Sequence, residues 1–68
     1  MLVFFQITAR YWRVYFQDGM SELLIGRLHD IDGKIAFVAD EGVDFALSQD
    51  DLLALLSQIR LVEKENPS

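Results

Sequence analysis

The sequence predicts an α+β domain, in which a four- or five-stranded antiparallel β-meander is followed by one C-terminal α-helix packed on it. Two observations predict this fold. Residues 2–47 contain runs rich in aromatic and β-branched residues, interrupted by turns about every 10–15 residues. Over residues 48–63 the apolar residues recur at helical spacing instead. We expect the 68 residues to form a single domain with a frayed tail at 64–68.

The first strand-forming segment, residues 2–17, changes its apolar pattern partway along. Up to Ile7 the apolar residues stand at odd and even positions alike, so both faces of the strand are predicted to be covered. From Trp12 onward the even positions are apolar, while Arg13 marks the odd face as solvent-exposed. A bulge or bend would re-aim the side chains between these two stretches. The pattern predicts two strands, or one long strand broken near Ala9.

Asp-Gly pairs divide the next part of the chain into further strands. They stand at residues 18–19 and 32–33, and Asp-Gly suits turn positions that need a positive φ. Strands are therefore predicted over residues 22–29 and 35–39, and a short fifth strand over 43–47.

Gly26 interrupts the predicted strand 22–29 without a turn to serve. A glycine inside a strand often marks a bulge or a close approach of another group. We expect a bulge here, or close packing by Trp12 or Phe16.

The C-terminal helix is predicted to begin at Ser48, whose hydroxyl can accept a hydrogen bond from the amide of Asp51. Asp50 and Asp51 in the first turn are favourable at the positive end of the helix dipole. The helix is expected to lie across one face of the sheet. Alternatively, the sheet curls strongly into a small barrel and the helix plugs an open end. The predicted buried stripe consists of Leu52, Leu55, Leu56, Ile59 and Val62.

A second strip on the same helix indicates self-association. Leu53 and Leu61 lie off the predicted buried stripe, beside the small residues Ala54 and Ser57. A 68-residue domain has little core to cover two helix faces, and chains of this size often need reinforcement. The absence of cysteine excludes disulfides and thiolate metal sites. We therefore expect a homodimer or higher homo-oligomer formed through these four residues.

The net charge of −5 is unevenly distributed. Residues 1–17 contain two arginines and no acid, whereas residues 30–51 contain seven acidic residues against one lysine. Phosphates of DNA and RNA repel a strongly acidic protein, so the charge opposes nucleic acid as a partner. We expect the acidic residues to keep a leucine-rich protein in solution, or alternatively to form a patch that docks a basic protein or mimics nucleic acid.

No catalytic residue, metal ligand or cofactor site is expected, and the chain is not predicted to be an enzyme. His29, Asp30 and Asp32 form the cluster most similar to an acid–base or metal site. Neighbouring strand residues point to opposite faces, and aspartates in tight turns usually bond their own backbone. The remaining ligands of a calcium-binding loop are missing, as are a nucleophile elbow and a phosphate-binding glycine loop.

Tyr11, Arg13 and Tyr15 are predicted to share one face of a strand. Aromatic and arginine side chains on an open sheet can stack on exposed bases, and they are also enriched at protein interfaces. A third interpretation is structural, with half-buried tyrosines and arginines that extend to solvent.

These observations predict a small acidic homo-oligomeric interaction module, an accessory or regulatory protein of a bacterium or phage that binds another macromolecule. The alternative is a nucleic-acid or small-ligand binder that uses the aromatic and arginine sheet face. Met1–Phe5 lacks the features of a signal peptide, and no run approaches the roughly 20 apolar residues of a membrane helix. We expect a cytoplasmic protein that does not contact a membrane.

Overall fold

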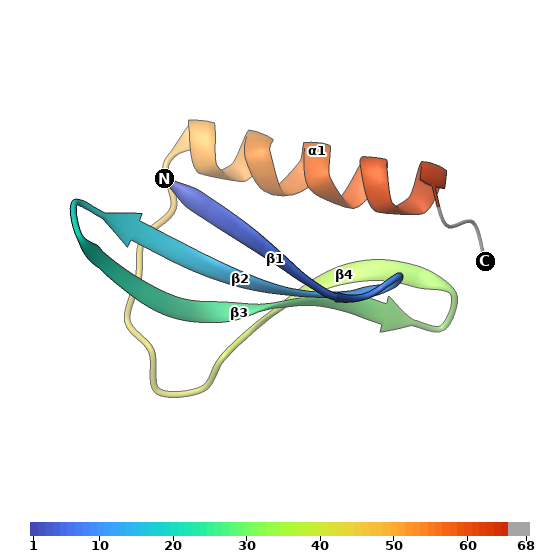
Figure 1. The fold of residues 1–68 in the computed structure, drawn as a ribbon, viewed down its shortest axis with the longest axis horizontal. Helices are drawn as coiled ribbons and strands as arrows, with labels where there is room; N and C mark the ends of the chain where they lie inside the picture. Colours follow the sequence, from blue (N-terminus) through green and yellow to red (C-terminus); the bar gives the residue numbers. More distant parts are fainter. Residues whose placement is uncertain (66–68) are drawn as a thin grey trace.

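The computed structural model describes residues 1–65, which form four strands and one helix (Figure 1). The strands make one antiparallel sheet in the order β1-β2-β3-β4, which confirms the predicted α+β meander in its four-stranded, open form. The elements are β1 (Leu2–Thr8), β2 (Tyr11–Asp18), β3 (Ser21–Ile31), β4 (Lys34–Ala39) and α1 (Gln49–Glu65).

The end of the chain differs from the prediction of a frayed tail. Residues 64 and 65 belong to α1, so the helix continues beyond its predicted end at residue 63. The rest of that tail, residues 66–68, lies outside the described residues.

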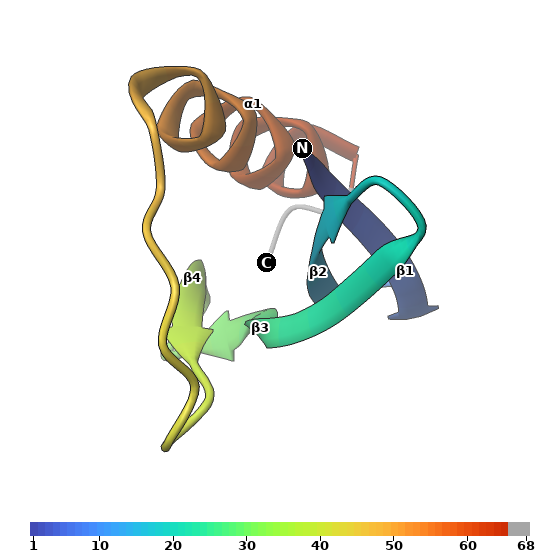
Figure 2. The same cartoon turned by 90° about the vertical axis from the view of Figure 1, so that its left-hand side faces the viewer.

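The helix lies along one face of the sheet, which agrees with the first of the two predicted arrangements (Figure 1). Viewed end on, the sheet curls beneath the helix (Figure 2). Helix α1 approaches the two edge strands, β1 and β4, more closely than the central strands. The helix therefore spans the concave side of an open, curled sheet.

The core fills the space between the curled sheet and the helix. Val14 of β2 and Leu28 of β3 are completely buried, as expected for central strands. Trp12 and Phe16 of β2 pack around them, on the face that the even positions of this strand were predicted to bury. All five elements contribute to the buried set, which comprises Leu2, Val14, Ile25, Leu28, Ile35, Leu55 and Val62.

The predicted buried stripe of the helix was wrong in part. Leu55 and Val62 are buried, but Leu52 and Leu56 are 55% and 42% exposed. The predicted stripe spans roughly 120° of the helix surface. The curled sheet contacts a sector centred on Leu55 and Val62, so Leu52 and Leu56 fall on the flank of the helix. Ile59 packs partly against the core.

The predicted fifth strand, residues 43–47, is not part of the sheet. Its side chains alternate as in a strand, with Val43, Phe45 and Leu47 half-buried against the core. The ring of Phe45 meets Phe37 of β4 edge-on, with 6.4 Å between the ring centroids. The segment rises beside the sheet to the first turn of α1 (Figure 2). It packs through its side chains rather than by strand pairing.

Residues 2–17 form two strands rather than one long broken strand, which confirms the first of the two predicted alternatives. The pairing of β1 with β2 shifts between Gln6 and Thr8, so Ile7 is an extra residue in β1. The turn follows at residues 9–10. The bulge and the turn together account for the change in apolar pattern along this segment.

A second bulge lies next to Gly26, as predicted. Gly26 pairs with Val14 and Leu24 pairs with Tyr15, so Ile25 is an extra residue and its side chain is buried. The close neighbour, however, is neither Trp12 nor Phe16. A Cβ atom at Gly26 would collide with the carbonyl oxygen of Val38 and would lie 2.8 Å from the ring of Phe37. Gly26 therefore allows β3 and β4 to approach each other.

Candidate interaction surfaces

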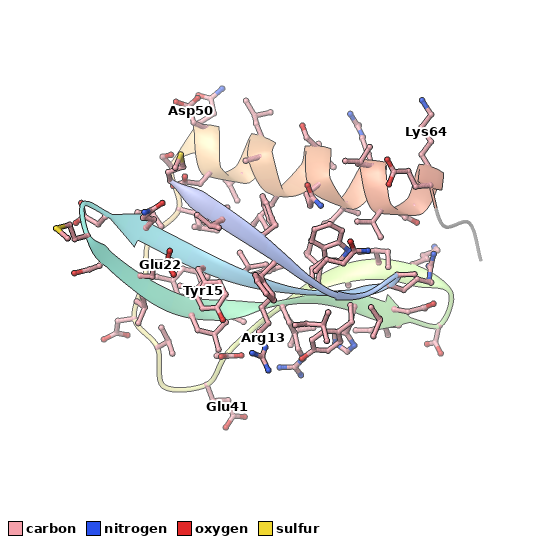
Figure 3. The ribbon with its side chains drawn as sticks, in the orientation of Figure 1. Arg13, Tyr15, Glu22, Glu41, Asp50 and Lys64 are labelled. Carbon is pink, nitrogen blue, oxygen red and sulfur yellow. The ribbon has the colours of Figure 1, made fainter. Side chains whose placement is uncertain are left out.

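The outer face of the sheet, which points away from α1, carries the predicted set Tyr11, Arg13 and Tyr15. Arg13 and Tyr15 project from this face in Figure 3. Within residues 1–65 no helix or strand covers it. The prediction that both faces of the first segment are covered was therefore wrong, and Phe5 on this face is 59% exposed.

A shallow groove of about 440 Å³ crosses this outer face between β1, β2 and β3. Val3 pairs with Tyr15 and Phe5 pairs with Arg13 across the first two strands, and Glu22 of β3 also lines the groove. The groove therefore combines an apolar and aromatic floor with one cationic and one anionic side chain. Sequence reasoning found its β2 residues, because they alternate along one strand. It missed the other three because they depend on the register between strands.

Arg13 lies directly opposite Arg27 on the same outer face. Like charges in this position of an antiparallel pair repel each other. Nη1 of Arg27 lies 3.6 Å from Oδ1 of Asp40, which offsets part of this repulsion. Arg13 is exposed, so the centre of the outer face presents a positive charge in an otherwise acidic protein.

His29 packs against Tyr11 on this face, with 6.0 Å between the ring centroids. Its Nε2 atom is buried and has no hydrogen-bond partner among the described residues. A nitrogen in that position is not accessible to a substrate. Across residues 1–65 no group of three His, Asp or Glu side chains is arranged to hold a metal ion.

Asp30 serves the β3–β4 turn, as the sequence indicated. Its Oδ1 accepts a hydrogen bond from the amide of Gly33 over 2.8 Å, and Oδ2 accepts one from Nε of Arg10 over 2.7 Å. The hydrogen bond from Arg10 is the main cause that lowers the pKa of Asp30 below its ordinary value. Asp32 adopts a positive φ of 54° in the same turn. The aspartates are thus explained by turn geometry.

Ser48 and Asp51 form a reciprocal cap at the start of α1. The amide of Asp51 donates to Oγ of Ser48 over 3.2 Å, as predicted, and the amide of Ser48 donates to Oδ2 of Asp51 over 3.0 Å. The backbone hydrogen bond from Ser48 lowers the pKa of Asp51. This cap determines where the helix begins and hence the axial position of every residue along it.

The predicted self-association residues do not all lie at the surface. Leu53 and Leu61 are 53% and 46% exposed, and Ser57 is exposed. Ala54 packs partly against the core. The exposed part of the predicted set is therefore Leu53, Ser57 and Leu61, with one leucine on each side of the serine along the helix.

An open cleft of about 770 Å³ lies where the first turn of α1 meets the start of β1 and the end of the connecting segment. Leu2, Phe16 and Leu47 line it with apolar surface, and Asp50 and Asp51 add two carboxylates. Sequence reasoning missed this cleft because it is assembled from separate elements. Its carboxylates repel anionic ligands.

Comparisons with protein-family models, with the curated proteins and with the solved structures give no match for this chain. In the described part of the chain, no helix combines the length and the apolar character needed to cross a membrane.

Proposed function

We propose that this chain is a small interaction module that associates with a second copy through α1 and binds another macromolecule through the outer sheet face. The observation that carries the proposal is the pair Leu53 and Leu61, which are about half exposed and stand on either side of the small, exposed Ser57. Single exposed leucines are common in proteins. Two on one strip of α1 favour an interface, because a chain of 68 residues buries little apolar surface by itself.

The outer sheet face supports the second half of the proposal. It combines the exposed ring of Phe5 with Tyr15 and Arg13, and tyrosine and arginine are enriched at protein interfaces. The helix α1 lies along the opposite face of the sheet (Figure 1). A second copy bound to α1 would therefore leave the sheet face accessible to a different partner.

Sedimentation velocity over a range of protein concentrations tests the self-association. We expect the parent to shift from monomer to dimer with rising concentration, and the Leu53→Glu/Leu61→Glu variant to stay monomeric. In an isologous dimer these substitutions place four charges in one interface. Circular dichroism checks that the variant is folded.

A second pair of exposed leucines on α1 provides a matched control for the Leu53→Glu/Leu61→Glu variant. The Leu52→Glu/Leu56→Glu variant changes two leucines of similar exposure, 55% and 42%, on another side of α1. We expect it to dimerise like the parent. A parent that is monomeric at every concentration would contradict the proposal, as would a control that dissociates while the Leu53→Glu/Leu61→Glu variant does not.

A second candidate function is binding of a nucleic acid or small anionic ligand at the sheet face. The specific observation that favours it is the position of Arg13 opposite Arg27 beside aromatic side chains, where an anion would relieve the repulsion. Fluorescence anisotropy of labelled single-stranded RNA at two salt concentrations tests it. Salt-sensitive binding that is lost in Arg13→Ala would support this alternative. Trp12 is a poor reporter for this test because it packs toward the core.

A further inference from the structure

We infer that the second copy docks on α1 in the antiparallel direction, with a two-fold axis that passes close to Ser57. This inference rests on the proposed self-association and adds its orientation and its contacts. The surface concerned, called here the helix strip, consists of five exposed residues: Asp50, Leu53, Ser57, Leu61 and Lys64.

The helix strip is symmetric about its centre. Leu53 and Leu61 each stand four residues from Ser57, and Asp50 and Lys64 each stand seven residues from it. At about 100° per residue, all five fall within a sector roughly 80° wide. Leu55 and Val62, at the centre of the buried stripe, lie on a different side of the helix. A two-fold axis perpendicular to α1 at Ser57 therefore brings Leu53 to the level of Leu61 in the second copy.

The charges at the two ends of the helix strip select the antiparallel direction. Figure 3 shows Asp50 near the beginning of α1 and Lys64 near its end, both turned away from the sheet. An antiparallel pair places the Asp50 carboxylate of each copy beside the Lys64 ammonium of the other, so the contact occurs two times in the dimer. A parallel pair would place Asp50 beside Asp50 and Lys64 beside Lys64. Exposed charges of this kind contribute more to orientation than to affinity.

The residue at the centre allows the two helices to come close. Packed helices in proteins are 8–10 Å apart, depending on the side chains at the crossing point, and serine is small. Leucines on both sides of Ser57 then supply the apolar contact. A single pair of helices buries an area at the lower end of the range for stable interfaces, so we expect a reversible dimer.

Cysteine cross-linking tests the orientation, because the chain contains no cysteine of its own. We expect Ser57→Cys to form a disulfide-linked dimer under mild oxidation, since a residue on the axis faces its own copy. Asp50→Cys alone should not cross-link, whereas a mixture of Asp50→Cys and Lys64→Cys should give the mixed dimer. Glu41→Cys, an exposed residue of the connecting segment far from the strip, measures random collision (Figure 3).

Charge reversal provides an independent readout that needs no cross-link. Asp50→Lys should raise the dimer dissociation constant roughly tenfold, because two attractive pairs become two repulsive pairs. Adding Lys64→Asp to that variant should restore the dissociation constant of the parent. Circular dichroism on each variant separates a change in association from a change in folding.

The outcomes distinguish this inference from the proposal on which it rests. If Leu53→Glu/Leu61→Glu abolishes the dimer but Asp50→Cys cross-links with itself, the copies are parallel and the antiparallel inference is wrong. The inference is also wrong if Asp50→Lys raises the dimer dissociation constant and adding Lys64→Asp does not lower it again. If the parent never dimerises, both the proposal and the inference fail.

Discussion

Arg10 and Asp30 connect the two turns at one end of the sheet, with 2.7 Å between Nε of Arg10 and Oδ2 of Asp30. Arg10 belongs to the β1–β2 turn and Asp30 lies just before the β3–β4 turn, so the contact joins residues that are distant in the sequence. Nη2 of Arg10 also donates to the carbonyl oxygen of Gly33 over 3.3 Å. The arginine thereby orients the hairpin that Asp30 already stabilises through the amide of Gly33.

The first prediction concerns acid sensitivity. The pKa values of Asp30 and Asp51 are lowered in the folded protein by hydrogen bonds from Arg10 and Ser48, respectively. A lowered carboxyl pKa stabilises the fold above the ordinary pKa of about 4, and this stabilisation is lost as the pH falls through the lowered pKa. The melting temperature should therefore fall on acidification below about pH 4. The fall should be smaller in Asp30→Asn, which removes one of the two carboxylates with a lowered pKa.

The second prediction concerns the helix cap. Ser48→Ala should lower the free energy of unfolding by about 1 kcal/mol, because it removes the acceptor for the Asp51 amide. Ser48→Asn is the matched control, since asparagine is an equally good cap, and it should remain close to the parent. Urea denaturation followed by circular dichroism measures both. Equal losses in the two variants would show that the hydroxyl does not act as the cap.

The third prediction concerns Gly26. Gly26→Ala should lower the free energy of unfolding by about 1–3 kcal/mol, because the new Cβ must displace the backbone of Val38 and the ring of Phe37. Combining it with Phe37→Leu should recover only part of this loss, since the Val38 carbonyl oxygen remains in the way. An unchanged stability in Gly26→Ala would show that β3 and β4 are less close than the structure has them.

The fourth prediction compares two neighbouring leucines. Leu55 is 6% exposed and Leu56 is 42% exposed, although the apolar pattern predicted both to be buried. Leu55→Ala should lower the free energy of unfolding by about 2–5 kcal/mol, and Leu56→Ala by clearly less. Chemical denaturation of the two variants at the same protein concentration measures the difference. The reverse order would mean that α1 is rotated about its axis.

The fifth prediction concerns His29. Replacing it with phenylalanine removes a buried nitrogen that has no partner within residues 1–65, so His29→Phe should leave the melting temperature unchanged or raise it. His29→Ala should lower it, since it removes the ring that packs on Tyr11. Chelators should not change the melting temperature of the parent. A sharp fall with a chelator would reveal a metal site.

The sequence by itself was sufficient for the features that depend on neighbouring residues. The alternation of Trp12, Val14 and Phe16 indicated the inner face of β2, and the Asp-Gly pairs indicated the β2–β3 and β3–β4 turns. The cap at Ser48 followed from the preference of serine for the first position of a helix. In each case the physical cause acts over four residues or fewer, so it can be read along the chain.

The candidate surfaces were only partly predictable for the same reason. Tyr11, Arg13 and Tyr15 share a face because side chains alternate along one strand. The groove that includes Arg13 and Tyr15 also needs Val3, Phe5 and Glu22, which reach it through the register between strands. That register depends on bulges at Ile7 and Ile25; the sequence indicated a bulge near each place only as one of two alternatives, and it did not show which residues of neighbouring strands would pair.

The tertiary structure decided which of the apolar surfaces are buried. The sequence indicated that α1 is apolar on several sides, but the curl of the sheet selected Leu55 and Val62 and left Leu52 and Leu56 exposed. Likewise, the alternation of Val43, Phe45 and Leu47 predicted a strand. In the structure these side chains pack against the core beside the sheet, and the segment does not pair with any strand within residues 1–65. A local pattern determines which side chains point the same way. Whether they meet the core depends on the combined packing of elements that are far apart in the chain.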